Sequence, residues 1–251
     1  TDMDSVPPSP MMLPDQKVWT SGKWDIESSS AWIKDKATTT FSNNDVVLLD
    51  ISGDNSSDII LEGSLQPKDL RIISPIDYVL AGSGSIDGET NLTKSGKGTL
   101  TFNNSNADTG ITRVWDGQII NNGTLENSKV LVKRFATAAG AGTYNNGIVL
   151  EKYANLIVSE AQASADTLFV SGTLTADAQS TIQMDLTDDF EAASKINDLI
   201  VIDGNFKING LMSITINRLD GKLSAGEYVL MNVSDSLIGN VEDIAIDGIS
   251  G

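Results

Sequence analysis

The chain has 251 residues, of which 40% are hydrophobic, and its 34 acidic residues exceed its 17 basic ones, giving a formal net charge of −17. This length and hydrophobic content suffice for a buried core in one large domain or two small ones, which excludes a disordered polyelectrolyte. The electrostatic field of a chain with this negative net charge repels phosphate backbones and anionic membrane surfaces, so we expect no nucleic-acid partner. A polyanionic polysaccharide would also be repelled at long range, unless Ca²⁺ or a local basic patch intervened.

Several chemistries are excluded by the residue types that the chain lacks. It contains no histidine and no cysteine, so Ser-His-Asp and Cys-His catalysis, disulfides and the usual zinc sites are impossible. No window approaches the ~18 consecutive apolar residues of a membrane span, so we expect none. High acidity without cysteine suits a protein that works outside the cytoplasm.

Residues 1–16 differ from the rest of the chain because they hold four of its six prolines. These prolines favour an extended, polyproline-like linker, which predicts a β domain over residues 17–251. The sequence starts with neither an initiator Met nor a signal peptide, so we expect it to be a piece of a longer protein.

From residue 17 onward the sequence consists almost wholly of short strand-like runs, such as residues 46–50, 98–102 and 211–216. Asn-Gly and Asp-Gly pairs, which accept positive φ angles, separate many of these runs and mark tight turns. Only residues 190–196 look helical. We therefore predict an all-β fold whose strands must stack on neighbours to bury their apolar faces.

The spacing of glycines favours one all-β architecture. Gly98, Gly123, Gly147 and Gly172 each begin a strand-like run, at intervals of 25, 24 and 25 residues. Three strands and three turns need about that length, so we predict a parallel β-helix, or β-solenoid, with about 20–25 residues per rung. A β-sandwich, which also has turns every ~8–12 residues, is the alternative.

Asparagine is concentrated in the expected turns. In stacked rungs such side chains could align into hydrogen-bonded amide ladders, which further favours the solenoid. The residues concerned are Asn103, Asn104, Asn106, Asn121, Asn122, Asn145 and Asn146.

The stretch LTKSGKGTLTF at 92–102, followed by TGITRVWDGQI at 109–119, resembles the autotransporter-associated β-strand repeat, also called the passenger-associated transport repeat. The matching residues are Leu92, Lys94, Gly96, Gly98, Thr99, Leu100, Thr109, Gly110, Thr112 and Gly117. Two positions depart from the usual pattern: Asp108 stands where an aromatic residue is common, and Ile119 stands where leucine is.

This resemblance implies a right-handed parallel β-helix in an exported bacterial protein, either secreted or exposed at the outer membrane and cell surface. Within it, Gly96, Gly98, Gly110 and Gly117 are expected to be structural turn residues. It implies no single activity, because the repeat occurs in adhesins, in secreted enzymes and in multidomain proteins that act on polysaccharides.

Candidate catalytic carboxylates are few. A glycosidase on a β-helix would need two or three carboxylates clustered on one face. The nearest set in the sequence is Asp185, Asp188 and Asp189, to which Asp198 could return. Charge clusters are mostly surface features, so we interpret this set as an acidic, solvated loop and predict no catalytic residue.

A Ca²⁺-assisted lyase would need a metal site and a basic residue. Asp50, Asp54 and Asp58 could offer oxygens to Ca²⁺, but they lack the EF-hand pattern, and turn capping explains them better. Four basic residues lie in or beside expected strands, and the sequence does not assign them to particular acidic residues: Arg71, Arg113, Lys133 and Arg134. We expect no metal site and no cofactor, with Ca²⁺ as the one cation left open.

Tryptophan is rare enough in this chain to single out. Trp19, Trp24 and Trp32 fall in the first rungs, where a solenoid must cover its open core, so we interpret them as capping residues. The alternative is an exposed, sugar-stacking platform, in which they would bind a ligand. Trp115 likewise is either a strand-end packing residue or an exposed sugar contact.

These observations support one hypothesis and two alternatives. The hypothesis is a non-catalytic β-helix scaffold, spacer or carbohydrate-binding module of an exported bacterial multidomain protein. It would serve polysaccharide use at the cell surface, beside a neighbouring domain or partner protein. The first alternative is a polysaccharide lyase or glycosidase with its active site on the β-helix face. The second is a fragment of an adhesin passenger.

Overall fold

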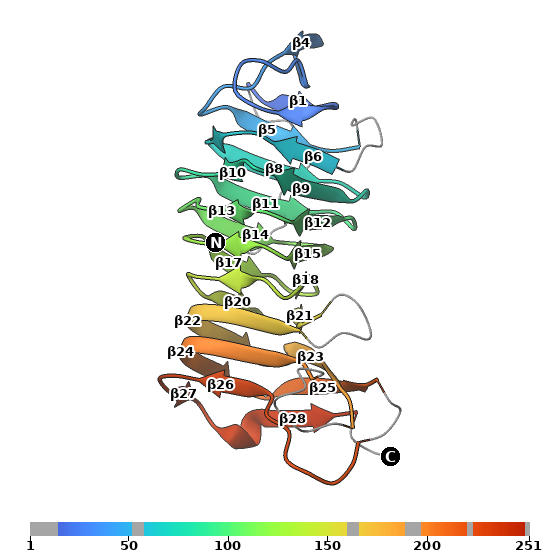
Figure 1. Cartoon of the computed structure of the whole chain (residues 1–251), viewed down its shortest axis with the longest axis vertical. Helices are drawn as coiled ribbons and strands as arrows, with labels where there is room; N and C mark the ends of the chain where they lie inside the picture. Colours follow the sequence, from blue (N-terminus) through green and yellow to red (C-terminus); the bar gives the residue numbers. More distant parts are fainter. Residues whose placement is uncertain (1–14, 52–57, 160–165, 189–196, 220–222, 249–251) are drawn as a thin grey trace.

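A computed structural model describes residues 15–51, 58–159, 166–188, 197–219 and 223–248 of the chain. These residues form one elongated stack of short β-strands that runs from the N-terminal to the C-terminal end (Figure 1). Successive rungs pair in parallel throughout the stack. The fold is therefore all-β and a parallel β-solenoid, as predicted, and the β-sandwich alternative is wrong.

Two predictions fall largely on residues that are not described. The Pro-rich linker over residues 1–16 is described only from residue 15 onward, and the expected helix over 190–196 lies outside the described residues altogether. Both stay predictions. Within the described residues, no helix is long and apolar enough to cross a membrane.

Each full rung has three strands, and equivalent strands stack into three faces. Face A contains β1 (Lys17–Trp19), β5 (Val46–Leu49), β8 (Asp69–Ile73), β11 (Asn91–Ser95), β14 (Ile111–Val114), β17 (Lys129–Val132), β20 (Ile148–Leu150), the second halves of β22 (Thr167–Asp177) and β24 (Leu199–Asn209), and β27 (Leu237–Ile238). Face B contains β2 (Lys23–Trp24), β6 (Asp58–Leu61), β9 (Tyr78–Gly82), β12 (Thr99–Phe102), β15 (Gln118–Asn121), β18 (Thr137–Ala139), β21 (Asn155–Ile157), β23 (Thr181–Leu186), β25 (Met212–Arg218) and β28 (Ile244–Asp247). Face C contains β7 (Ser64–Leu65), β10 (Ser85–Ile86), β13 (Ser105–Asn106), β16 (Thr124–Leu125), β19 (Thr143–Tyr144), the first halves of β22 and β24, and β26 (Met231–Val233).

The rungs differ in length. Along face A the residue number rises by 22, 20, 18, 18, 26 and 32 from one rung to the next, at the aligned positions Leu70, Leu92, Thr112, Val130, Ile148, Leu174 and Phe206. The expected length of 20–25 residues per rung holds for the first two intervals, whereas the next two are shorter and the last two are longer. The long rungs are those of β22 and β24, each of which runs straight from face C into face A.

The glycine spacing that suggested the rung length mixes different corners. In the structure Gly98 aligns with Gly117, and Gly123 aligns with Gly142. The 25-residue interval between Gly98 and Gly123 is therefore one rung plus the width of one face. Glycine recurs at more than one corner of the rung, so its spacing alone does not measure a full circuit.

The core is a continuous column of inward-facing apolar side chains. On face B, Leu100, Ile119, Ala138, Leu156 and Ile182 occupy equivalent positions in successive rungs, and none has any exposed surface. Burying each large aliphatic side chain contributes about 1.5–3 kcal/mol. Because a rung of such short strands cannot bury this surface alone, each rung depends on the ones above and below it.

The N-terminal end is closed by an aromatic cap. An antiparallel hairpin of β3 (Trp32–Lys34) and β4 (Ala37–Thr39) folds against β1. Trp19, Trp24 and Trp32 are 0% exposed, and the rings of Trp24 and Trp32 meet edge to face with centroids 5.0 Å apart. The capping interpretation is confirmed. The sugar-platform interpretation of these three residues is wrong, because a fully buried ring offers no face to a ligand.

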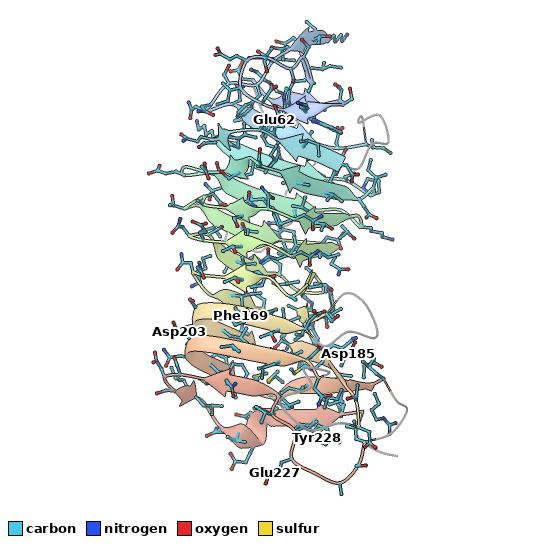
Figure 2. The ribbon with its side chains drawn as sticks, in the orientation of Figure 1. Glu62, Phe169, Asp185, Asp203, Glu227 and Tyr228 are labelled. Atoms are coloured by element: carbon cyan, nitrogen blue, oxygen red, sulfur yellow. The ribbon has the colours of Figure 1, made fainter. Side chains whose placement is uncertain are left out.

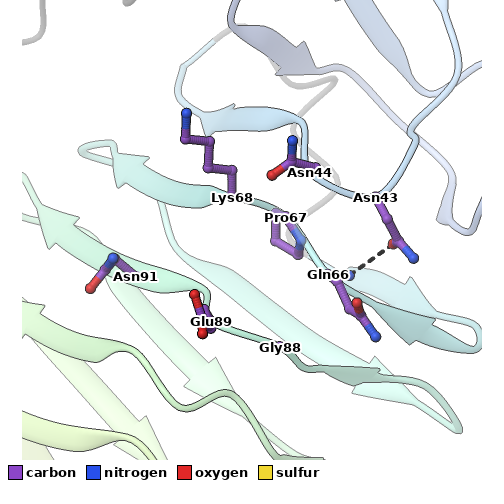
Figure 3. A pocket seen from close by; sticks show the side chains of 8 residues that line it. All are labelled: Asn43, Asn44, Gln66, Pro67, Lys68, Gly88, Glu89 and Asn91. Atoms are coloured by element: carbon purple, nitrogen blue, oxygen red, sulfur yellow. Dashed lines mark hydrogen bonds between the residues drawn. The ribbon is translucent and has the colours of Figure 1, made fainter.

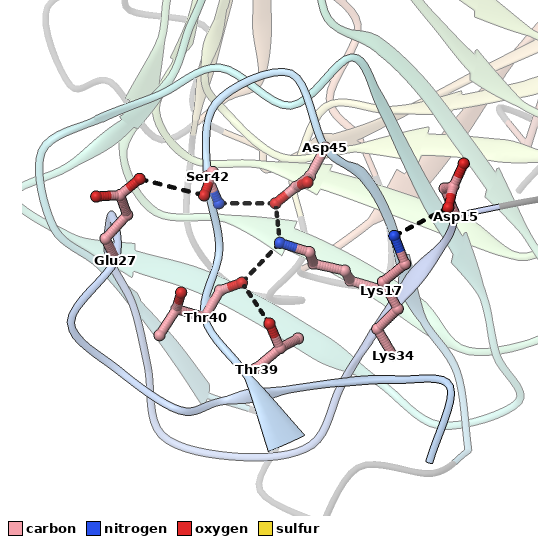
Figure 4. A network of polar contacts seen from close by, with 8 residues as sticks. All are labelled: Asp15, Lys17, Glu27, Lys34, Thr39, Thr40, Ser42 and Asp45. Atoms are coloured by element: carbon pink, nitrogen blue, oxygen red, sulfur yellow. Dashed lines mark hydrogen bonds and ion pairs between the residues drawn. The ribbon is translucent and has the colours of Figure 1, made fainter. Parts of the chain in front are cut away.

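Polar contacts hold the loops of the cap in place (Figure 4). The ammonium of the buried Lys17 lies 2.6 Å from Asp45 Oδ2 and donates to the Thr40 carbonyl oxygen at 2.8 Å. The same Asp45 oxygen accepts a hydrogen bond from the Ser42 backbone N–H at 2.7 Å. One buried lysine thus ties the strand that starts the solenoid to the segment that follows the hairpin.

The expected asparagine contacts between rungs occur, but mostly in a different form. One amide-to-amide pair joins adjacent rungs, with Asn122 Nδ2 donating to Asn103 Oδ1 at 3.2 Å. Other asparagines donate instead to a backbone carbonyl of the neighbouring rung, as Asn104 does to Gly84 at 2.9 Å and Asn146 to Asn127 at 2.7 Å. The side chains therefore mainly complete the backbone hydrogen bonding of the turns.

The cap predicts a large difference between two tryptophans. Trp24→Ala should lower the free energy of unfolding by about 3–5 kcal/mol, because it empties a buried aromatic site. Trp115→Ala, at a partly exposed ring, should cost about 1 kcal/mol or less. Urea unfolding followed by circular dichroism measures both. Equal losses in the two variants would show that the cap does not hold the first rungs.

Candidate functional site

The four glycines of the central motif all lie between strands, as expected, but for two reasons. Gly96 and Gly117 have φ angles of 80° and 71°, which favour glycine. Gly98 and Gly110 lie so close to the preceding rung that an added Cβ would stand 2.1 Å from the Ile76 carbonyl oxygen and 1.9 Å from the Thr90 carbonyl oxygen, respectively. These residues shape the turns and offer no group for chemistry.

The lysine of the same motif points into the solenoid. Lys94 has no exposed surface, and its ammonium donates to the carbonyl oxygens of Gly96 at 2.7 Å, Asp116 at 3.1 Å and Ser95 at 3.3 Å. It thus joins its own turn to the turn of the next rung. Burial lowers the pKa of Lys94 from 10.5 to about 8, although Asp116 and Asp77 act against this shift.

The carboxylates considered for catalysis come together only in part. Asp198 does return to Asp185, but its two oxygens accept the backbone N–H groups of Asp166 at 3.0 Å and Asp185 at 2.7 Å. Asp198 is 1% exposed, and burial raises its pKa to about 6. Asp189 lies outside the described residues. Asp185 accepts the Asn217 side-chain amide at 2.9 Å, and Asp188 accepts the Ser224 backbone N–H. These carboxylates therefore take part in holding strands and turns of the solenoid together.

The structure offers no support for Ca²⁺ binding by Asp50, Asp54 and Asp58. Asp58 is exposed at the start of β6, the Asp50 carbonyl oxygen accepts the Tyr78 hydroxyl, and Asp54 lies outside the described residues. Over the ranges that the structure describes, no three acidic side chains are arranged to hold a metal ion.

A shallow groove of about 430 Å³ crosses the corner between faces C and A in the first rungs (Figure 3). Most of its lining residues have polar side chains and none is aromatic: Asn43, Asn44, Gln66, Pro67, Lys68, Gly88, Glu89 and Asn91. Asn43 Oδ1 accepts the Gln66 backbone N–H at 3.0 Å, so part of this amide surface is used by the turn itself. The groove has no ring on which a ligand could stack.

The strongest candidate site is a group of aromatic and basic side chains at the corner between faces A and B. We call it the aromatic corner and define it as Trp115, Lys133, Arg134, Phe135, Lys152 and Tyr153, from the turns after β14, β17 and β20. The rings of Phe135 and Tyr153 stack, with centroids 5.4 Å apart and planes inclined by 21°. Phe135 is 65% exposed, so solvent reaches this stack directly.

The two stacked rings stand on strained turns. Phe135 and Tyr153 both have φ of 66°. The Ala136 backbone N–H donates to the Lys133 carbonyl oxygen at 3.0 Å, and the Ala154 backbone N–H donates to the Glu151 carbonyl oxygen at 2.8 Å. A positive φ at the third residue is the type II pattern, for which glycine is usual, and it costs a bulky residue about 1–2 kcal/mol. The turn of the rung before uses Gly117 instead.

Cations surround these rings at short distances. The Arg134 guanidinium carbon lies 4.7 Å from the Phe135 ring centre and 4.4 Å from that of Tyr153. Lys152 Nζ lies 5.2 Å from the Tyr153 ring centre. Lys133 is buried, with its ammonium 4.9 Å from the Trp115 ring centre and 2.6 Å from Glu151 Oε1.

Two of the four basic candidates, Lys133 and Arg134, thus lie together, while Arg71 is buried on β8 and donates to Gln16 at 3.3 Å. Arg113 lies on β14. Trp115 is partly exposed beside Lys133, which is compatible with both packing and ligand contact.

The sequence contains a signal for this corner that strand patterning misses. The tetrapeptides KRFA at 133–136 and EKYA at 151–154 repeat after 18 residues, which is the local rung length. Each has a basic residue followed by an aromatic residue and alanine. A search for repeats at the rung length would therefore have found Phe135 and Tyr153.

A comparison with known protein families finds none whose model matches this chain, and a comparison with curated proteins finds no relative.

Lys94 predicts a specific pH dependence of stability. Between pH 8 and 10.5 the unfolded chain holds the Lys94 proton more tightly than the folded chain does, so this residue makes the free energy of unfolding rise with pH in that window. Lys94→Met should lack this rise, which would amount to roughly 2–3 kcal/mol at most. Urea unfolding at pH 7.5, 9 and 10.5 measures it.

Lys97→Met is the matched control, because Lys97 is an exposed lysine of the same turn. It should keep the pH dependence of the unaltered chain. Parallel pH profiles for Lys94→Met and the unaltered chain would contradict the buried, easily deprotonated state of Lys94.

Proposed function

We propose that this chain is a non-catalytic β-solenoid scaffold of an exported bacterial surface protein and that its aromatic corner binds carbohydrate. The observation that carries the binding role is the exposed stack of Phe135 and Tyr153 on turns that disfavour bulky residues. Strained residues that persist without a packing need are frequently part of a functional site. The resemblance to the autotransporter-associated repeat supports the exported, surface-located setting.

Carbohydrate suits this corner on physical grounds. Sugar rings have apolar C–H faces that pack on aromatic rings, while their hydroxyl groups take hydrogen bonds from charged side chains at the edge of a site. The corner supplies one exposed ring, Phe135, and two partly exposed rings, Tyr153 and Trp115, from successive rungs, with three basic side chains around them. Rungs of a parallel sheet are about 4.8 Å apart, so these rings form a strip along the solenoid axis.

The enzyme alternative has less support. A lyase or glycosidase would need free carboxylates in a cleft, and the Asp185–Asp198 pair uses its Asp198 oxygens to accept backbone N–H groups. The aromatic corner itself is an outward turn in which Glu151 is paired with Lys133 at 2.6 Å. We therefore assign the corner a binding role.

Phe135→Asn tests the binding role separately from folding. Asparagine tolerates a positive φ, so relief of strain should offset the lost ring stacking, and the free energy of unfolding should change by less than about 1 kcal/mol. Carbohydrate binding should fall at least tenfold, which corresponds to about 1.4 kcal/mol. Thermal unfolding and binding to an immobilised panel of neutral and acidic oligosaccharides measure the two effects.

Phe169→Asn is the control, because Phe169 is also a large exposed aromatic residue, 44% exposed on β22 and away from the corner (Figure 2). It should leave binding unchanged. The carbohydrate role of this corner would be refuted if the unaltered chain bound no oligosaccharide of the panel. It would also be refuted if the Phe135→Asn variant bound as tightly as the unaltered chain.

A further inference from the structure

The basic residues of the aromatic corner stand out against the charge of the whole chain. The chain carries 34 acidic and 17 basic residues, yet three basic side chains meet within two adjacent turns of the corner. Lys133 and Glu151 pair with each other at 2.6 Å and so neutralise one another. Arg134 and Lys152 are left, and both are exposed.

Neither of these two cations has an acidic partner within the described part of the chain, where the ion pairs involve other residues. The turns on which these cations lie and the turn before them hold two acidic residues: Glu151, which pairs with Lys133 at 2.6 Å, and Asp116, whose Oδ1 accepts the backbone N–H of Gly117 at 2.9 Å. The corner therefore offers two positive charges beside exposed rings, with their ionic interactions unused.

The position of Arg134 suits a planar anion. Its guanidinium carbon is within 4.7 Å of both ring centres, so the side chain is held against the stack. A guanidinium held in this way on aromatic rings keeps its in-plane N–H groups available, and their fork matches the two oxygens of a carboxylate. Lys152 adds a point charge 5.2 Å from the Tyr153 ring centre.

We propose, on the basis of the carbohydrate-binding function above, that the aromatic corner selects acidic sugars, with Arg134 and Lys152 binding a uronate carboxylate while the sugar ring packs on Phe135 and Tyr153. The negative field of the chain opposes any dense polyanion at long range, so the local cations select a ligand with one charge per ring. Nucleic acid, with one charge per ~1.7 Å of duplex, is repelled more strongly.

The proposal is tested by calorimetric titration of the full chain at 0.15 M salt, where the Debye length is about 8 Å and distant charges are screened. The probes are hexamers of galacturonate, guluronate and mannuronate, the methyl esters of the same hexamers, cellohexaose and an oligothymidylate. We expect at least one uronate hexamer to bind at least tenfold more tightly than its ester. Arg134→Gln and Lys152→Gln should each weaken that binding at least fivefold, and Arg134→Lys should weaken it less.

Lys129→Gln is the matched control, since Lys129 is an exposed lysine on the same rung at another corner, and it should leave affinity unchanged. Equal binding of uronate hexamers and their esters would overturn the acidic selectivity and leave the carbohydrate function standing. Equal binding of oligothymidylate would overturn the assignment to sugars. Absence of binding to every hexamer would overturn both proposals together.

Discussion

The pairing of one rung with the next is the interaction on which this structure depends. The strands of face C in the first rungs are two residues long, and those of faces A and B are rarely longer than five. No such strand is stable alone. Parallel pairing solves this by placing like positions above one another, so that each buried side chain meets a neighbour of the same kind. At the corners where two backbones approach most closely, any side chain larger than glycine would displace the backbone of the adjacent rung. Gly98 and Gly110 show how little room is left.

A stack of this kind must also cover the core at its end rungs, and among the described residues β1 has a parallel neighbour, β5, on one side only. Here the chain changes from parallel to antiparallel pairing, and the β3–β4 hairpin brings Trp32 over the core beside Trp24. Large rings suit this position because one indole covers the area of several aliphatic side chains. The buried Lys17 then satisfies carbonyl and carboxylate oxygens of the covering loops. The cap therefore combines buried aromatic rings, which cover the core, with polar contacts that hold its loops in place.

The all-β class, the stacked architecture and the capping tryptophans could be predicted because they follow from strand length, turn chemistry and the need to cover a core. The rung length could be predicted only roughly. Glycine is required wherever two backbones approach closely, and this happens at several corners, so the glycine spacing does not show that Gly98 and Gly123 occupy different corners.

Of the aromatic corner, the sequence analysis singles out only Trp115, Lys133 and Arg134. Phe135 follows the strand-like run KVLV with only Lys133 and Arg134 between, and an aromatic residue there looks like the end of a buried strand. Only the turn geometry shows that it faces outward.

The corners of this solenoid differ in the constraint that decides which residue types their turns accept. Between faces A and B, the third turn residue has positive φ in successive rungs, at Phe135, Tyr153 and Gln179. Gly117 aligns with Phe135 and also has positive φ, which shows that glycine is compatible with this position. Stability therefore gives no reason for two aromatic rings there, since glycine or asparagine would fit with less strain. Their stacking and the guanidinium that lies against both rings recover part of the cost, but only because the rings are on adjacent rungs. The regular stacking that supports the fold thus also aligns an outward-facing pair of rings, and this alignment is what makes the corner suited to binding.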